Sequence, residues 1–369
     1  MRKIKLKPDI GILTLPVHAN FGGALQALAL YEYLRRCGFK PILIRREATR
    51  SPYKAVVKNL VAKIPFVDFR NWKQQVKKKN LHKSFIGSYV QQSKRLENEK
   101  DVKNLVEKSE FRAVIVGSDQ VWRLEYMPDR DYRSFFLSFI DSRGLKKISY
   151  AASFGSVSWA HPELSPSVRK YLQDFDAISV RELSGRAICG QLGRHDAQVV
   201  LDPTLLLERK FYDRLIGDAA QNLRFDVFTY ILDNSEKISA VLQRVRANSS
   251  FRSQRVVSLN EPSGLIEIPE WLGCFKAANF IVTDSFHGVI FSIIFEKQFL
   301  GVVNKKRGSD RMKSLLGEIG LADRLIDDSE CYDFEKLVNS KIDYCDVNRK
   351  LHRWRSFSER FIANAISHP

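Results

Sequence analysis

A histidine and an aspartate stand between two apolar runs in the segment TDSFHGVIFS, residues 283–292. The first run, FIV, is typical of a strand, and the second, VIFSIIF, is typical of a helix. His287 would then begin the helix, where free N–H groups and partial positive charge favour phosphate or carboxylate. Asp284 and Ser285 are residue types that cap helices. His287 is therefore either a general acid and base or only the polar start of a buried helix.

Cationic residues follow two other apolar strands. Arg181 comes directly after AISV, where a guanidinium can bind a carboxylate or phosphate in a fork or form a salt bridge with Glu182 or another acid. The segment NKKRGSDR follows a later apolar run and offers Lys305, Lys306, Arg307 and Arg311. Together with His287 these side chains can form a pocket for an anion, although each of them can equally belong to a solvated loop.

Two patterns limit the possible chemistry. The loop HANFGG contains the backbone-permissive residues Asn20, Gly22 and Gly23, but it does not match GxGxxG, and the chain has no P-loop motif. The 5 cysteines are odd in number and none forms a CxxC pair, which indicates free thiols in a reducing compartment and argues against a zinc site. We expect no metal ion and no cofactor.

The elements that must position these residues alternate between strands and helices. DIGILTL, ALQALALYEYLRRCG and KPILIRRE predict a strand, a helix and a strand, which is the unit of a parallel sheet. Residues 51–110 are basic and helical in pattern, and we interpret them as an insertion. Further strands are predicted at the apolar cores of residues 111–122, 146–155, 177–180, 197–207, 226–232, 254–259, 279–283 and 299–303.

The length of 369 residues, with 44% hydrophobic and 28% charged residues, indicates a globular protein of two domains. We predict an N-terminal α/β domain over residues 1–205 and a second one over 206–345. Residues 346–369 are predicted as a C-terminal helix that can pack back on the N-terminal domain. Ligands of open parallel sheets bind beyond the carboxyl ends of the strands, so a cleft between the two domains is the expected site.

The net charge of +18 results from 60 Lys and Arg against 42 Asp and Glu. A basic surface can bind nucleic acid, an anionic membrane or an anionic substrate. No known nucleic-acid-binding motif accompanies the charge, so we expect no nucleic acid. No apolar stretch has the length of a membrane span or a signal segment, so we expect a cytoplasmic protein. The basic run at residues 71–84 can hold it at the inner face of the membrane.

Seven motifs together resemble a known family. In chain order they are HANFGGALQALAL, VIVGSDQVW, SYAASFG, AISVRE, VVLDPTLL, DSFHGVIFS and NKKRG. The set is similar to the polysaccharide pyruvyl transferase family over residues 9–325. The resemblance implies an α/β fold like that of the GT-B glycosyltransferases, with two Rossmann-like domains facing each other across a cleft. It also implies transfer of pyruvate from phosphoenolpyruvate to two hydroxyls of a sugar, giving a cyclic ketal and phosphate.

The resemblance assigns roles to individual residues. His287 matches the family's general acid and base, and Arg181 matches an arginine expected to bind the donor and to take part in catalysis. The implied donor-binding set is Arg181, Ser285, His287, Gly288, Lys305, Lys306, Arg307 and Arg311. The implied acceptor-side set is His18, Asn20, Gly22, Gly23, Ser118, Asp119, Gln120 and Trp122. Trp122 can stack on a sugar ring or belong to the core.

This chain departs from the family pattern at two places. Arg307 stands where many members have a lysine, which leaves open whether Lys305, Lys306 or Arg307 holds the donor. The first loop reads NFGG where many members have GNxGD, so the acceptor preference can differ. The implied partners are phosphoenolpyruvate and a bacterial surface glycan, or its lipid-linked precursor. The alternatives are a GT-B-like glycosyltransferase that uses a nucleotide sugar, a basic nucleic-acid-binding protein, and an inactive member that binds glycans.

Overall fold

The computed structural model describes residues 7–17, 20–47, 69–127, 132–140, 144–249, 251–258, 265–327 and 333–367, with the backbone alone at 69–75 and 78. The described chain divides into two compact units. Unit 1 comprises the residues up to 17, residues 23–206 and the residues from 357 onward. Unit 2 comprises residues 20–22 and 207–356. The three residues 20–22 thus belong to unit 2, although their neighbours in the sequence belong to unit 1.

Unit 1 is built on a six-stranded sheet in the order β2-β1-β3-β4-β5-β6, and all its pairs are parallel. The strands β1 to β5 are almost wholly buried, as expected where helices cover both faces of a parallel sheet, whereas the two residues of the edge strand β6 are not. Their bounds are β1 Ile10–Leu13, β2 Pro41–Ile44, β3 Ala113–Val116, β4 Lys146–Ala152, β5 Ala177–Val180 and β6 Gln198–Val199.

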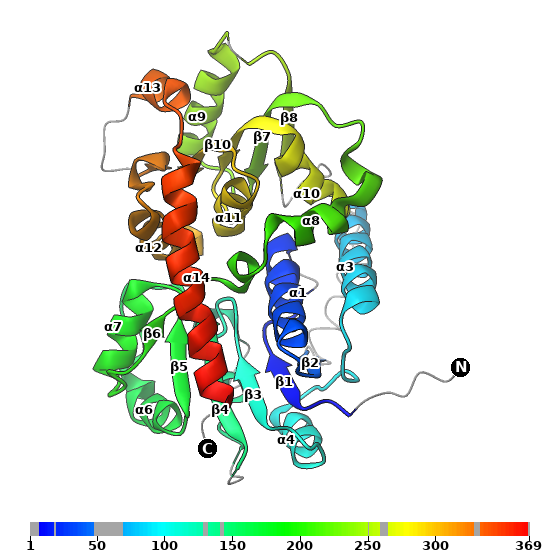
Figure 1. Cartoon of the computed structure of the whole chain (residues 1–369), viewed down its shortest axis with the longest axis vertical. Helices are drawn as coiled ribbons and strands as arrows, with labels where there is room; N and C mark the ends of the chain where they lie inside the picture. Colours follow the sequence, from blue (N-terminus) through cyan, green and yellow to red (C-terminus); the bar gives the residue numbers. More distant parts are fainter. Residues whose placement is uncertain are drawn as a thin grey trace. The chain divides into compact units, whose positions relative to one another are not determined.

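Helices connect and cover these strands (Figure 1). The helix α7 packs on β5 and β6, and Ile188 and Cys189 of this helix join the core cluster with Val180. The helices that lie in unit 1, wholly or for most of their length, are α1 Phe21–Arg36, α3 Phe69–Tyr89, α4 Glu99–Glu107, α5 Tyr132–Phe135, α6 Ser165–Gln173 and α7 Leu183–Gln191, with short 3-10 turns at Leu124–Tyr126, Pro162–Leu164 and Pro203–Leu206.

Unit 2 is built on a five-stranded parallel sheet in the order β11-β10-β9-β7-β8. The order places β9 between β7 and β10, and the register pairs Thr283 of β9 with Tyr230 of β7 and with Gly301 of β10. The carboxyl ends of these three strands therefore lie side by side. The bounds are β7 Phe225–Ile231, β8 Gln254–Ser258, β9 Ala278–Thr283, β10 Gln298–Val302 and β11 Leu325–Ile326.

An aromatic cluster fills much of the core of unit 2. Trp271 of α10 is fully buried and packs against Tyr230, Phe275 and Phe291, with ring centroids 4.7–5.3 Å apart. The helices of unit 2 are α8 Arg209–Ile216, α9 Glu236–Ala247, α10 Ile268–Ala277, α11 Phe286–Ile294, α12 Asp310–Ile319 and α13 Phe334–Asn339, with 3-10 turns at Gly217–Ala220, Lys305–Arg307 and Ala322–Arg324.

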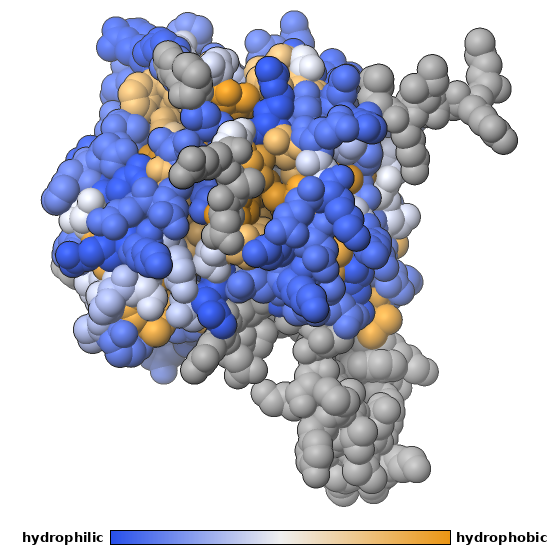
Figure 2. All heavy atoms as spheres, turned by 90° about the horizontal axis from the view of Figure 1, so that it is seen from below, coloured by the Kyte–Doolittle hydropathy of each residue, from blue (hydrophilic) through white to orange (hydrophobic). Residues whose placement is uncertain are grey.

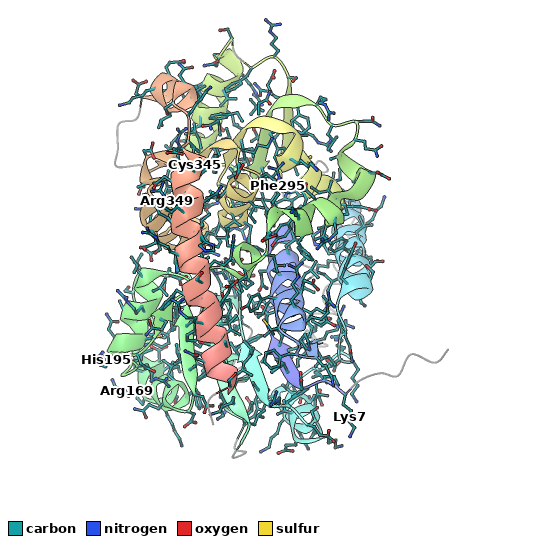
Figure 3. The ribbon with its side chains drawn as sticks, in the orientation of Figure 1. Lys7, Arg169, His195, Phe295, Cys345 and Arg349 are labelled. Atoms are coloured by element: carbon teal, nitrogen blue, oxygen red, sulfur yellow. The ribbon has the colours of Figure 1, made fainter. Side chains whose placement is uncertain are left out.

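The last helix, α14 Tyr344–Ser367, belongs to unit 2 up to residue 356 and to unit 1 beyond it. In unit 1 the Ser358 hydroxyl accepts a hydrogen bond from the Leu201 amide at 3.0 Å, and Phe361 lies 6.4 Å from the Tyr150 ring. Figure 3 shows Cys345 and Arg349 on this helix. Cys345 is one of the described cysteines, none of which forms a disulfide.

The predicted fold class is confirmed in that two parallel sheets of α/β character form the described chain. On the face shown in Figure 2, hydrophilic residues surround smaller apolar areas. Within the described ranges, no helix combines the length and the apolar character of a membrane span.

Candidate active site

His287 lies in the first turn of α11, two residues after the Ser285 cap and four residues after the end of β9. The Ser285 hydroxyl accepts a hydrogen bond from the Gly288 amide at 3.3 Å, which satisfies one of the free N–H groups of that turn. The His287 side chain is largely buried, and its ring lies 5.4 Å from that of Phe286 at 72°. The strand, the turn and the helix lie where the sequence predicts them.

Asp284 does not cap α11, although it is a residue type that caps helices. Its carboxylate instead accepts hydrogen bonds from the amides of Leu232 (2.6 Å) and Asp233 (3.2 Å), and from Nδ2 of Asn304 (2.7 Å). The reason is the strand order, because β7 and β10 flank β9 and bring their following loops to Asp284. Burial raises the pKa of the Asp284 carboxyl above its ordinary value, against the lowering effect of these hydrogen bonds.

Asp233 and Arg307 extend this network by a two-point ion pair. Arg307 donates from Nε to Oδ2 of Asp233 at 2.6 Å and from Nη2 to Oδ1 at 2.9 Å, and Asn304 also donates to Asp233 at 2.9 Å. The hydrogen bonds from Arg307 are the main reason why the pKa of Asp233 lies below its ordinary value. We name Asp233, Asp284, Asn304 and Arg307 the unit 2 network. Its members follow three adjacent strands.

The predicted donor cations occupy different positions. Arg307 is engaged by Asp233, and Arg311 donates to the Arg307 carbonyl at 2.6 Å while its guanidinium lies 5.2 Å from the Phe286 ring centroid. Lys305 and Lys306 are exposed and form the 3-10 turn with Arg307. The geometry thus favours the two lysines over Arg307 as cations that reach a ligand, and their role in donor binding stays a prediction.

A small open pocket lies beside the unit 2 network. Its volume is about 180 Å³. Three lysines contribute to its wall, whereas its single carboxylate, that of Asp233, already pairs with Arg307. The first turn of α9 adds the partial positive charge of a helix N-terminus, so the pocket is suited to a small anion. It is lined by Asp233, Asn234, Ser235, Lys237, Ile238, Val303, Asn304, Lys305 and Lys306.

Arg181 forms a buried ion pair in unit 1. Its Nη1 donates to Oδ2 of Asp202 at 2.9 Å, and its Nη2 lies 3.7 Å from Oδ1 of Asp119. The side chains of Arg181 and Asp202 are each 1% exposed. The acid that pairs with Arg181 is therefore Asp202, which follows β6, and not its neighbour Glu182. The donor-binding role of Arg181 stays a prediction.

The predicted acceptor-side residues after β3 are tied into the same region. The Ser118 hydroxyl donates to the Ala151 carbonyl at 3.3 Å and lies 3.4 Å from Oδ2 of Asp202. Gln26 of α1, which the sequence analysis overlooked, accepts from the Ser118 amide at 3.1 Å and donates to Thr14 at 3.1 Å. We name Arg181, Asp119, Asp202 and Ser118 the unit 1 network. The Gln120 amide donates to Oδ1 of Asp119 at 2.9 Å, and the Gln120 side chain accepts from Arg123 at 2.9 Å.

Trp122 requires a correction, because the structure places it in the core. Its side chain is 1% exposed, its ring stacks on Phe136 at 5.3 Å, and its Nε1 donates to the Phe135 carbonyl at 3.0 Å. No ring face is left for a sugar. Several aromatic residues follow Trp122 in the sequence, and this pattern could have indicated that Trp122 belongs to an aromatic core. His18 lies outside the described residues. Asn20 and Gly22 belong to unit 2, and Gly23 belongs to unit 1.

Besides Gln26, the polar residues Asp202, Asp233 and Asn304 are also absent from the site that the sequence predicts. Each follows a strand, so the same rule that selected Arg181 and His287 could have selected them. Within the part of the chain that the structure describes, no group of three or more His, Cys, Asp and Glu residues could hold a metal ion.

Comparison with known proteins gives a family and a fold. The model of the family "Polysaccharide pyruvyl transferase" matches residues 20–306, which is more than half of the chain. A UDP-N-acetylglucosamine 2-epimerase structure is similar with a TM-score of 0.50 and 11% identity, over 96% of this chain and 94% of the other. The UDP-N-acetylglucosamine 2-epimerase of Neisseria meningitidis has a TM-score of 0.45 and 9% identity, over 97% and 94%. No curated protein sequence matches.

Proposed function

Since the chain belongs to the polysaccharide pyruvyl transferase family, we propose that it transfers pyruvate from phosphoenolpyruvate to two hydroxyls of one sugar in a glycan. The observation that carries the proposal is His287 at the start of α11, within the matched residues and in the same unit as a lysine-lined pocket. The donor carries a phosphate and a carboxylate, and it therefore needs cations and helix N-termini.

The proposed reaction has two steps. In the first, a sugar hydroxyl adds to the central carbon of phosphoenolpyruvate while His287 donates a proton to the CH₂ carbon, so that a C–O bond forms and the double bond is lost. In the second, another hydroxyl of the same sugar attacks that carbon, the bond to the phosphate oxygen breaks, and phosphate leaves. His287 returns to its protonated form by accepting the proton of one hydroxyl, and the proton of the other hydroxyl leaves with the phosphate. The product is a cyclic ketal of pyruvate.

The pocket supports the choice of donor. At about 180 Å³ it is smaller than the roughly 300 Å³ at which pockets for drug-sized ligands begin. A phosphate or a carboxylate of a small donor fits such a volume. We assign Lys305 and Lys306 to binding of the donor. Arg307, in the same 3-10 turn, attaches this turn to Asp233 by an ion pair.

The test is acceptor-dependent release of phosphate from phosphoenolpyruvate. A panel of β-galactosides, glucosides and mannosides, free and lipid-linked, is compared for the wild type and for His287→Ala. We expect release by the wild type and a loss of at least ~100-fold in the variant, as removal of a general acid predicts. Release that survives in His287→Ala would assign the acid to another residue. Binding of UDP-sugars without binding of phosphoenolpyruvate would favour a glycosyltransferase instead.

We also propose that the acceptor is lipid-linked and that α3 holds the protein at an anionic membrane surface. Lys77 and Lys83 of this helix are exposed, and each basic residue near such a surface contributes about 1 kcal/mol. Sedimentation with liposomes containing anionic lipid is expected to recover more protein than sedimentation with neutral liposomes. Replacement of both lysines by glutamine should reduce the difference, and equal, negligible binding to both kinds of liposome would refute the proposal.

A further inference from the structure

Phe21 fixes the chain at residues 20–22 in unit 2. Its side chain is fully buried and stacks on Trp271 with a centroid distance of 4.9 Å and an interplanar angle of 5°. Its ring centroid also lies 6.0 Å from that of Tyr230, with the ring planes at 72°. Aromatic pairs of this kind add about 0.5–1.5 kcal/mol to the burial of their area. The backbone that follows Phe21 is therefore held in place by the aromatic cluster of unit 2.

Gly22 lies directly against the imidazole of His287. A methyl group added at Gly22 would lie 2.0 Å from Nδ1, 2.3 Å from Cγ and 2.7 Å from Cε1 of that ring. Carbon and nitrogen atoms that are not bonded do not approach so closely. The imidazole thus occupies the space that any side chain at residue 22 would need, and only glycine is compatible with the observed position of the ring.

The first turn of α11 cannot move away easily to relieve such a clash. Gly288 packs tightly as well, because a methyl group there would lie 2.2 Å from Oγ1 of Thr283. That hydroxyl donates to the Tyr230 carbonyl at 2.7 Å and accepts from the Ser285 amide at 3.1 Å. The turn that carries His287 is therefore anchored to β7, whose Tyr230 also contacts Phe21.

We propose that Gly22 is a positioning residue for His287, and that Phe21 is its anchor. The inference rests on the proposed function, in which His287 is the general acid and base. It gives Gly22 a different role from the acceptor-side one that the family resemblance implies. Because a displacement of about 1 Å in a reacting group can lower a rate by ~100-fold, Gly22→Ala should act on the chemical step through the histidine.

The first test reports the position of the ring without any assay of activity. Imidazole resonances of the 7 histidines are recorded by NMR for the wild type, and those of His287 are identified by their absence in His287→Ala. In Gly22→Ala we expect the His287 resonances to shift while the other histidines stay unchanged. Gly317→Ala is the matched control, because Gly317 is also a helical glycine assigned to unit 2 and a methyl group there would meet no atom within 4 Å.

The second test is kinetic and uses phosphate release. Gly22→Ala should lower kcat by at least ~10-fold with little change in KM, because the chemical step is affected more than binding. In the His287→Ala background the same substitution should cause no further loss, since it acts through the missing ring. If wild-type protein releases no phosphate, the proposed function fails, but the NMR test still decides whether Gly22 positions the ring.

Two outcomes would overturn the inference. One is a Gly22→Ala protein whose His287 resonances match those of the wild type. The other is a double variant whose loss is the product of the two single losses. If Gly22→Ala does not fold, Phe21→Leu replaces it, because leucine keeps the site apolar but loses the stacking on Trp271. That variant should shift the His287 resonances by a smaller amount, and an unchanged spectrum would count against the anchor.

Discussion

Both units gather polar side chains where parallel strands end, but they arrange them in opposite ways. In the unit 1 network Arg181 and Asp202 form an ion pair whose side chains are each 1% exposed. In the unit 2 network Arg307 and Asp233 form an ion pair whose side chains are 34% and 22% exposed, beside an open pocket. The same strand-end position therefore produces a closed cluster in one unit and an accessible one in the other.

The difference shows that a strand-end cation is not by itself a ligand-binding cation. A buried charge must be paired, because its desolvation costs several kcal/mol, so Asp202 and Arg181 depend on each other for stability. A half-exposed pair is solvated and contributes less, and its neighbours Lys305 and Lys306 reach solvent. We therefore expect substitutions in the unit 1 network to affect stability most, and those near the unit 2 pocket to affect ligand binding most.

The largest effect should come from the buried pair. Asp202→Asn keeps the shape of the side chain but removes the negative charge that faces Arg181 at 2.9 Å. Loss of one partner of a buried pair costs about 3–5 kcal/mol, and we expect the free energy of unfolding, measured in urea, to fall by an amount in that range. Lys7→Ala is the control, because Lys7 and Glu110 form an ion pair with side chains 77% and 69% exposed. If Asp202→Asn is as stable as that control, the contrast between the units is wrong.

An intermediate effect is expected at Asp284, the one fully buried acid of the unit 2 network. Asp284→Asn replaces an accepting oxygen by an NH₂ group that would face a donor, either a backbone amide or Asn304. An unsatisfied buried donor costs about 1–3 kcal/mol. Thermal and urea unfolding should show this loss, whereas Glu236→Gln on the exposed start of α9 should show almost none. If Asp284→Asn leaves the free energy of unfolding unchanged, the three strand-end loops hold together without the Asp284 carboxylate.

The smallest effect concerns the half-exposed pair, and it depends on pH. The pKa of Asp233 is lowered in the folded protein, chiefly by Arg307. The stability that the pair contributes is therefore present above the ordinary aspartate pKa of about 3.9 and is lost as the pH falls through the lowered value. At pH 7 Asp233→Asn should cost about 1 kcal/mol or less. Urea unfolding from pH 7 to pH 3 should show this difference shrinking, and a constant difference would contradict the ion pair.

The sequence by itself determined the elements and the place of His287. Apolar runs of strand and helix length, with a Ser at the cap, are local signals, and they indicate that His287 begins a helix after a strand. The same rule found Arg181 at the end of β5. Family motifs in a fixed order added the fold class and the family, because such motifs are also read along the chain.

Only the tertiary structure decided which side chains meet. Aspartate is a residue type that caps helices. The strand order instead places Leu232 and Asn304 beside Asp284, although they are 52 and 20 residues away in the sequence. Arg307 pairs with Asp233 across 74 residues. From the sequence alone, Gly22 is a backbone-permissive loop residue. Only the structure places the imidazole of His287 against it. These partners are set by the order and register of parallel strands and by packing between distant segments, and a pattern of neighbouring residues does not encode them.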